Sequence, residues 1–260
     1  MRKIHHHFSR IAHSYRDLRT TDLEPILFIQ KKLQRKSKII AANVGCGAGR
    51  YDLKLFRHLG NKLFLYCIDA NEEMLKHLKD FLDKHEIRDF NTIKANAEKI
   101  PLADNSLDCV LTFNALHHFK PLDFLKESSR ILEDNGYLFI YTRLRSQNRR
   151  NIWGRYFPLF NEKETRLYEL NELRNLLTEI PQLEIESIEY FKYSRLASLH
   201  WLVNQAQYHH YSTFYLYTPK ELEQSLEKFK QNIQKDFEDL ERITWFDENL
   251  LLVIRKTNRC

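Results

Sequence analysis

The sequence is poor in cysteine, and none of its cysteines stands in a spacing typical of a disulfide framework or a zinc site. The four cysteines, Cys46, Cys67, Cys109 and Cys260, are far apart, and no two of them form a C-x-x-C pair. Three of the four fall in expected strands or in a glycine-rich turn. We therefore expect reduced thiols and a cytoplasmic protein.

Long apolar runs are also missing. No run reaches the roughly 20 residues that a membrane-spanning helix needs, and the start MRKIHHHFSR lacks the apolar stretch of a signal peptide. His5, His6 and His7 have no flanking cysteine or carboxylate cluster, and His209 and His210 have no partners at zinc-ligand spacing. We expect no membrane span and no metal site. The first three of these histidines are expected in a mobile N-terminal segment, and the other two at the end of a surface helix.

A strong charge imbalance and internal repeats are likewise absent. The net charge of +6 is a mild basic bias, which suits a solvated surface and leaves open an anionic substrate or a nucleic acid. The 260 residues are 43% hydrophobic, enough to bury a full core. No repeat, low-complexity segment or convincing linker divides them, so we expect one domain with insertions.

The most informative segment is IIAANVGCGAGRYDL, residues 39–53, in which an apolar strand runs into a glycine-rich turn that opens a helix. The sequence has six glycines, and Gly45, Gly47 and Gly49 lie in this turn. They let the backbone approach a ligand at the N-terminus of the helix. Arg50 stands where a dinucleotide fingerprint has its third glycine, which argues against NAD and FAD.

Strands and helices alternate around this turn. A helix within residues 20–36 is expected to begin with a capping box from Thr21 to Glu24. Such alternation requires right-handed crossovers and a parallel sheet covered on both faces, so the core is an open α/β sheet over about 38–142. The expected strands are 38–44, 62–68, 91–94, 107–113 and 137–142, and the expected helices are 50–59, 71–84 and 121–132.

Beyond the sheet, residues 143–166 are polar, arginine-rich and aromatic, which favours an exposed loop or lid. Thr218 at the N-cap, Pro219 at the first helical position and Glu221 predict the start of a long helix. The other expected elements are helices over 169–179, 196–207 and 219–237 and strands over 184–193 and 249–256.

In an open α/β sheet the ligand lies beyond the carboxyl ends of the strands. The second strand ends at Asp69, where a carboxylate can accept hydrogen bonds from two ribose hydroxyls or can simply cap the next helix. Asn96 and Ala97 follow the third strand, where polar groups can form hydrogen bonds to the edge of an adenine or can simply form an ordinary turn. After the fourth strand, Asn114 and His117 would face the reactive end of a cofactor. His117 is a candidate base, and a packing role is the alternative.

Four ordered blocks together resemble the class I S-adenosylmethionine-dependent methyltransferases, nearest to the ubiquinone and menaquinone biosynthesis type. The blocks are VGCGAGR, CIDANEEML, NAEKIPLADNSLDCVLTFNALHHF and RILEDNGYLFI. The resemblance implies a Rossmann-like, seven-stranded, mostly parallel sheet with an antiparallel last strand. It also implies S-adenosylmethionine as methyl donor and S-adenosylhomocysteine as product. We expect an N-terminal lid and helix over 1–37 and a methyltransferase domain over 38–260, with helical insertions at about 143–168 and 195–240 that form a substrate lid.

The resemblance also implies which residues hold the cofactor. Glycines of the turn would line its methionine part, Asp69 its ribose, and the residues after the second and third strands its adenine. The family usually has Asp where this chain has Asn96, whose amide can still accept a hydrogen bond. The cofactor-binding residues predicted in this way are Tyr15, Gly45, Cys46, Gly47, Asp69, Ala70, Met74, Asn96, Ala97 and Asn114.

The acceptor pocket of this family is built by the N-terminal segment and the insertions. Arginines between aromatic residues can clamp an anion beside an apolar body, can contact unpaired nucleic acid, or can belong to a partly packed loop. The aromatic stretch 208–217 either roofs the same cavity or packs on its own insertion. The candidate acceptor-binding residues are Arg143, Arg149, Trp153, Arg155 and Tyr156.

The sequence therefore predicts a methyltransferase whose acceptor is a small molecule, anionic or aromatic and apolar. A tRNA or protein methyltransferase is the second possibility, although FNAL stands where amino-group methylation of bases or glutamine would call for an NPPY-type tetrapeptide. A cofactor-binding module that regulates another protein is the third possibility.

Overall fold

The computed structural model describes residues 21–209 and 211–258, so Tyr15, His5–His7, His210 and Cys260 lie outside the described residues. By internal packing the chain divides into two compact units. The first comprises the described residues up to Thr142 together with Leu170–Glu189 and the chain from Leu250 onward. The second comprises Arg143–Glu169 and Tyr190–Asn249.

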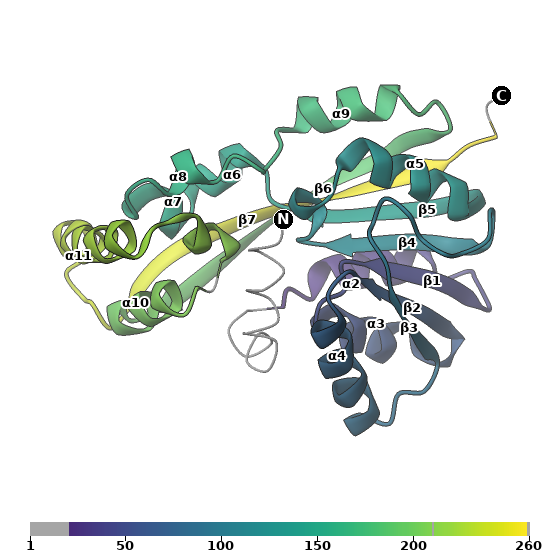
Figure 1. Ribbon diagram of the computed structural model, residues 1–260, viewed down its shortest axis with the longest axis horizontal. Coiled ribbons are helices and arrows are strands. Elements are labelled where there is room, and N and C mark those ends of the chain that lie inside the picture. The colour runs from purple at the N-terminus through teal and green to yellow at the C-terminus, as the bar shows by residue number, and fades with distance from the viewer. Residues whose placement is uncertain (1–20, 210, 259–260) are drawn as a thin grey trace. The chain divides into compact units, whose positions relative to one another are not determined.

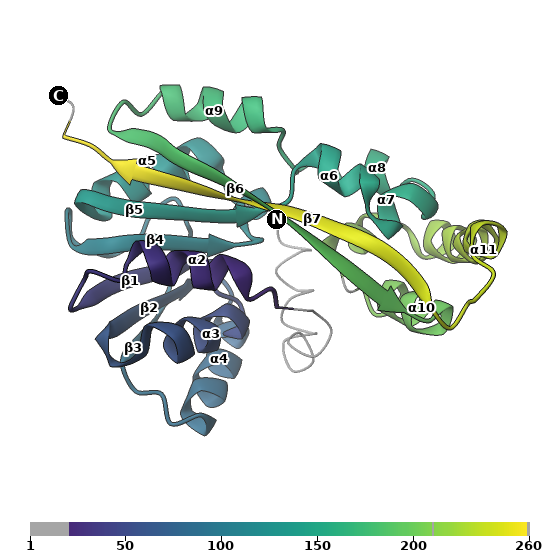
Figure 2. The same ribbon diagram turned by 180° about the vertical axis from the view of Figure 1, so that it is seen from behind.

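The first unit is built on a seven-stranded sheet with the strand order β3-β2-β1-β4-β5-β7-β6, which Figures 1 and 2 show from opposite sides. Neighbours among β1 to β5 are parallel, and β7 is antiparallel to β5, so the predicted fold class is confirmed. The strands are β1 (Ile39–Val44), β2 (Leu63–Asp69), β3 (Phe90–Lys94), β4 (Leu107–Phe113), β5 (Leu132–Thr142), β6 (Leu183–Ala197) and β7 (Ile243–Lys256).

Helices cover both faces of this sheet. In Figure 2, α2 and α3 lie in front of the sheet, whereas α5 and α9 lie on the opposite face. α4 packs on β2 and β3. The helices of the first unit are α2 (Glu24–Lys32), α3 (Arg50–Leu59), α4 (Glu72–Lys84), α5 (Pro121–Ile131) and α9 (Leu170–Thr178).

Local sequence explains where most of these helices begin. Asn71 caps α4 by accepting hydrogen bonds from the backbone N–H groups of Glu73 and Met74. Pro121 occupies the start of α5, where its missing N–H costs nothing. The predicted capping box at Thr21 is wrong, because α2 begins after Leu23 without a side-chain cap and has a proline in its first turn.

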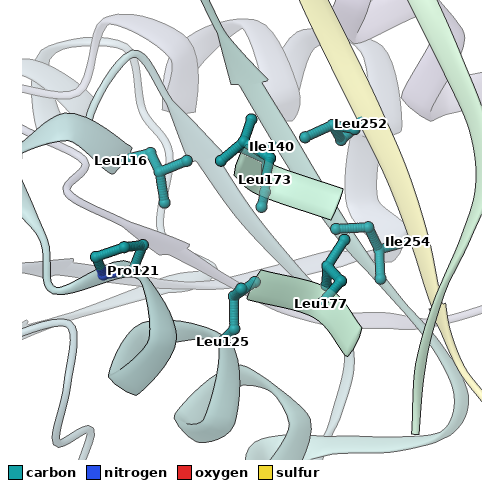
Figure 3. A pocket seen from close by; sticks show the side chains of 8 residues that line it. All are labelled: Leu116, Pro121, Leu125, Ile140, Leu173, Leu177, Leu252 and Ile254. Atoms are coloured by element: carbon teal, nitrogen blue, oxygen red, sulfur yellow. The ribbon is translucent and has the colours of Figure 1, made fainter. Parts of the chain in front are cut away.

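A completely apolar pocket of about 10 Å³ lies in the first unit between α5, α9 and the strands β5 and β7. Figure 3 shows its lining, in which no side chain carries a titratable or hydrogen-bonding group. Such a gap is a packing imperfection and offers no chemistry. The lining residues are Leu116, Pro121, Leu125, Ile140, Leu173, Leu177, Leu252 and Ile254.

The second unit has an apolar core of its own. Trp153 is 3% exposed and stacks on Phe229, with ring centroids 5.3 Å apart. Phe157, Phe160 and Phe214 surround the same indole. Its helices are α6 (Arg145–Arg150), α7 (Ile152–Tyr156), α8 (Phe160–Lys163), α10 (Leu199–Gln207) and α11 (Pro219–Asp236).

This core corrects several expectations. Residues 143–166 contain three short helices and buried aromatic side chains, so the expectation of an exposed loop is wrong, whereas the expectation of a lid stays a prediction. The stretch 208–217 contributes Phe214 and Tyr217 to the core, so it packs on its own insertion. β6 and β7 are longer than predicted, and α10 begins at Leu199 because Leu196 and Ala197 belong to β6. The capping box of Thr218 and Glu221 on α11 is confirmed.

The position of Trp153 predicts a large effect on stability. Trp153→Ala is expected to lower the free energy of unfolding by about 3–5 kcal/mol, because it removes the side chain at the centre of an aromatic core. Trp201→Ala is the matched control, since Trp201 is 42% exposed. Its expected cost is below about 1 kcal/mol. Urea unfolding followed by circular dichroism measures both, and equal costs would show that Trp153 is not a core residue.

Candidate functional site

The carboxyl ends of β1, β2 and β4 define the candidate site. The sheet order reverses beside β1, whose neighbours β2 and β4 lead away in opposite directions. At such a switch point the loops that follow the strands diverge and leave room for a ligand. The loops after β1, β2, β3 and β4 carry the cofactor residues that the sequence predicted and the structure describes.

The glycine turn after β1 has a backbone that only glycine adopts readily. Gly45, Gly47 and Gly49 have φ values of 72°, 57° and 86°, and Gly49 is the residue before α3. The N–H groups of Gly45 and Cys46 donate to the carbonyl oxygen of Ile68 at 2.8 and 3.1 Å. The turn is therefore fixed to the end of β2.

Gly45 is also required by its surroundings. A Cβ atom at this position would lie 2.6 Å from the Cβ of Ala115 and 2.9 Å from Cζ of Phe119. Both neighbours follow β4, so the turn packs closely against the segment between β4 and α5. The lack of a side chain at residue 45 is therefore needed for packing within the protein, in addition to any role in ligand binding.

Asp69 at the end of β2 organises the loops around it. One carboxylate oxygen accepts from the N–H of Gly47 at 2.9 Å, and the other accepts from the N–H of Asn71 at 2.8 Å. A carboxylate accepts at about four lone-pair positions, so these bonds are compatible with further donors such as ribose hydroxyls. Ala70 is half-buried beside it, and Met74 is buried in the first turn of α4.

The segment after β3 lies beside Asp69. The N–H of Ala95 donates to the backbone oxygen of Asp69 at 3.2 Å, and Asn96 and Lys99 close a short turn. Asn96 is exposed, whereas Ala97 is 6% exposed. The structure therefore brings the predicted ribose and adenine residues to one edge of the sheet.

The segment after β4 contributes two predicted residues. Asn114 has a φ of 53° and donates its N–H to the carbonyl oxygen of Tyr141 at 2.8 Å. His117 lies in the short 3₁₀ helix Leu116–His118, half-buried, with its ring centroid 4.0 Å from that of His118. A half-buried imidazole at a strand end can hold or release a proton near neutral pH.

Sequence reasoning missed an aromatic group at the same edge. Tyr51 stacks on Phe113 with ring centroids 4.3 Å apart, and Tyr141 meets both rings at 6.2 Å. The hydroxyl of Tyr141 donates to the carboxylate of Asp22 at 2.7 Å. The available signals were a tyrosine two residues after the glycine turn and a second tyrosine next to the last residue of β5.

The predicted acceptor residues differ in their burial and in their partners. In the second unit, Arg143 forms an ion pair with Asp247 at 3.1 Å, and its guanidinium lies 5.9 Å from the ring centre of Tyr211. Arg149 and Arg155 are exposed, and Arg155 lies over the ring of half-buried Tyr156. Trp153 belongs to the core.

Among the described residues no three histidine, cysteine, aspartate or glutamate side chains are grouped so that they could hold a metal ion. Cys46, Cys67 and Cys109 are buried free thiols. In the same part of the chain, no helix combines the length and the apolar character needed to cross a membrane.

Residues 42–140 match the model of the methyltransferase domain family. Together with the sheet topology, this match makes that part of the chain a class I S-adenosylmethionine-dependent methyltransferase domain, and the predicted resemblance is confirmed. S-adenosylmethionine is the methyl donor of this class. The glycine turn and the Asp69 carboxylate fit the methionine and ribose parts of such a ligand.

Known proteins similar to this chain agree with that class. The ubiquinone/menaquinone biosynthesis C-methyltransferase UbiE of Rickettsia prowazekii is 32% identical over 144 residues, which are 51% of this chain and 57% of that protein. The tRNA (carboxymethyluridine(34)-5-O)-methyltransferase ALKBH8 of mouse is 26% identical over 157 residues, 59% of this chain and 22% of that protein. The chain thus spans little more than half of the first relative and less of the second.

The solved structure of the YcgJ protein of Bacillus subtilis has the same fold. It superposes with a TM-score of 0.66 at 16% identity, over 91% of this chain and 99% of that one.

The crowding around Gly45 predicts a stability difference between two glycines. Gly45→Ala is expected to lower the free energy of unfolding by about 2–4 kcal/mol, because it adds an overlap to an unfavourable φ. Gly60→Ala is the control, since Gly60 has a φ of 64° with no atom within 4 Å of the added Cβ. Its cost should be only about 1–2 kcal/mol. Chemical denaturation measures both, and a smaller cost at Gly45 would contradict the packing described.

Proposed function

We propose that this chain transfers a methyl group from S-adenosylmethionine to a small-molecule acceptor in the cytoplasm. The observation that carries the proposal is the Asp69 carboxylate, joined to the glycine turn within a methyltransferase domain. S-adenosylmethionine supplies an activated methyl group, so the protein mainly needs to align the reactants. The buried free thiols support a reducing compartment.

The residues at the edge of the sheet have separate roles in this proposal. Asp69 accepts hydrogen bonds from the ribose hydroxyls, and the Asn96 amide with the Ala97 backbone meets the adenine edge. The turn of Gly45, Cys46 and Gly47 meets the methionine part. The remaining cofactor residues of the proposal are Tyr15, Ala70, Met74 and Asn114.

His117 is the candidate base in this proposal. A weakly acidic acceptor must lose a proton as the new bond forms, and a ring nitrogen of His117 can take it. For an acceptor that is already ionised, alignment is sufficient.

On the acceptor side we propose an anionic molecule with an aromatic or apolar body. Support comes from the side chain of Arg143, which is 10% exposed and paired with Asp247 beside Tyr211. A guanidinium positioned by a carboxylate and an aromatic ring is well suited to bind a second carboxylate or a phosphate. Arg149, Arg155 and Tyr156 remain further candidates for contacts with the acceptor.

Transfer to tRNA is the second candidate function. It is favoured by the similarity to the mouse tRNA methyltransferase and by the exposed Arg149 and Arg155, which can contact phosphates. Retention on immobilised tRNA that weakens steeply with salt would support it, and passage through the column at low salt would exclude it.

The proposal predicts that the full chain binds S-adenosylhomocysteine and that binding depends on Asp69. Asp69→Asn is expected to weaken binding by about 30-fold, because charge-assisted hydrogen bonds to the ribose are lost. Asp80→Asn, an exposed aspartate in α4, is the control and should bind like the parent protein. Isothermal titration calorimetry measures all three. A folded parent protein that binds no S-adenosylhomocysteine would defeat the proposal.

The acceptor can be found by incubating the protein with methyl-labelled donor and a metabolite extract. We expect label in small anionic molecules, and lower transfer by His117→Gln if the acceptor is a weak acid, by about 100-fold. Label recovered in tRNA would favour the second candidate. Binding of the donor without transfer to any fraction would identify a regulatory module in place of an enzyme.

A further inference from the structure

Three buried polar side chains meet beneath the glycine turn. Asn43 on β1, Asp52 on α3 and Cys67 on β2 are each at most 1% exposed. Nδ2 of Asn43 donates to Oδ1 of Asp52 at 3.1 Å, and Sγ of Cys67 donates to the same oxygen at 3.4 Å. One carboxyl oxygen of the helix α3 thus connects this helix to the two strands β1 and β2.

The other two oxygens of this group are unsatisfied. Oδ1 of Asn43 and Oδ2 of Asp52 are buried, and neither has a hydrogen-bond partner among the described residues. Leaving such atoms without a donor is costly in an apolar interior. Both oxygens are acceptors when Asp52 is ionised, and a single proton can join them.

We propose that Asp52 is a positioning residue for the cofactor site and acts as a carboxylic acid. A proton taken from solvent onto Oδ2 is donated to Oδ1 of Asn43, while Nδ2 of Asn43 donates to Oδ1 of Asp52. The acid and the amide then form a pair with two hydrogen bonds. Both previously unsatisfied oxygens are satisfied in this form.

The pair controls the shape of the turn because it joins the turn's two ends. Asn43 lies two residues before Gly45, and Asp52 lies in the first turn of α3, three residues after Gly49. Cys67 adds the neighbouring strand, whose next residue, Ile68, accepts the N–H groups of Gly45 and Cys46. Closing the pair therefore holds in place the backbone that meets the cofactor, an inference that rests on the proposed function.

The environment of Asp52 sets the pH at which the pair forms. Burial raises the pKa of Asp52 to about 6. The hydrogen bonds from Asn43 and Cys67 lower this pKa, and the negative charge of Asp69 raises it further. Burial also raises the pKa of Cys46 and of Cys67, which stay thiols. A pKa raised by folding gives a stabilisation that is present at low pH and is lost as the pH rises through about 6.

Calorimetric titration with S-adenosylhomocysteine at about pH 5.5 and about pH 7.5 tests the proposal. The parent protein should bind about fivefold more weakly at the higher pH. Asp52→Asn supplies a permanent N–H donor toward Asn43, so this variant should lose that pH dependence and bind like the parent protein at low pH. The same pH dependence in both proteins would overturn the proposal.

A pair of exchange variants separates positioning from mere stability. Asp52→Leu should weaken binding by about tenfold or more while circular dichroism shows a folded chain. The double variant Asn43→Asp, Asp52→Asn exchanges the positions of the acid and the amide. It should bind S-adenosylhomocysteine like the parent protein and with the same pH dependence. Failure of the exchange in a folded protein would contradict the paired arrangement.

The proposal can also be separated from the cofactor assignment. If the parent protein binds no S-adenosylhomocysteine at either pH, the proposed function fails. The existence of the pair is then tested by urea unfolding over the same pH range. The free energy of unfolding of the parent protein should fall with rising pH relative to that of Asp52→Asn. Parallel stability curves would overturn it without any ligand.

Discussion

The site depends on one carboxylate that joins two turns of the backbone. Asp69 accepts the N–H of Gly47 on one side and that of Asn71 on the other. Asn71 in turn caps α4, so the same carboxylate is bonded both to the glycine turn and to the residue that caps this helix. A ligand that engages Asp69 meets a site already organised by hydrogen bonds within the protein.

The second unit is stabilised by different interactions. Its core is aromatic, with Trp153 at the centre, and its polar network joins Arg143 and Arg195 to one carboxylate, that of Asp247. These features stabilise the unit by itself and place charged groups among aromatic rings. The first unit thus carries the described residues that we propose for the donor, and the second carries those that we propose for the acceptor. Folds often host function in this divided way, with a constant scaffold and variable insertions.

The sequence predicted the first unit well because its signals are local. The glycine turn before α3 and Pro121 at the start of α5 each act within a few residues. It failed where partners are distant in sequence. Trp153 looked like part of an exposed basic loop because its core partners, Phe214 and Phe229, lie more than 60 residues away. Asp52 was overlooked for the same reason, since its partners belong to two different strands and no periodicity marks a buried carboxyl group.

In the proposed function, Asp69 receives the ribose of the methyl donor. A crystal structure of the full chain grown with S-adenosylhomocysteine tests it most directly. Both ribose hydroxyls should then lie within about 2.5–3.0 Å of the Asp69 carboxylate oxygens, with the glycine turn in the conformation described. A bound ligand whose ribose contacts other groups, with Asp69 beyond hydrogen-bonding distance, would contradict it.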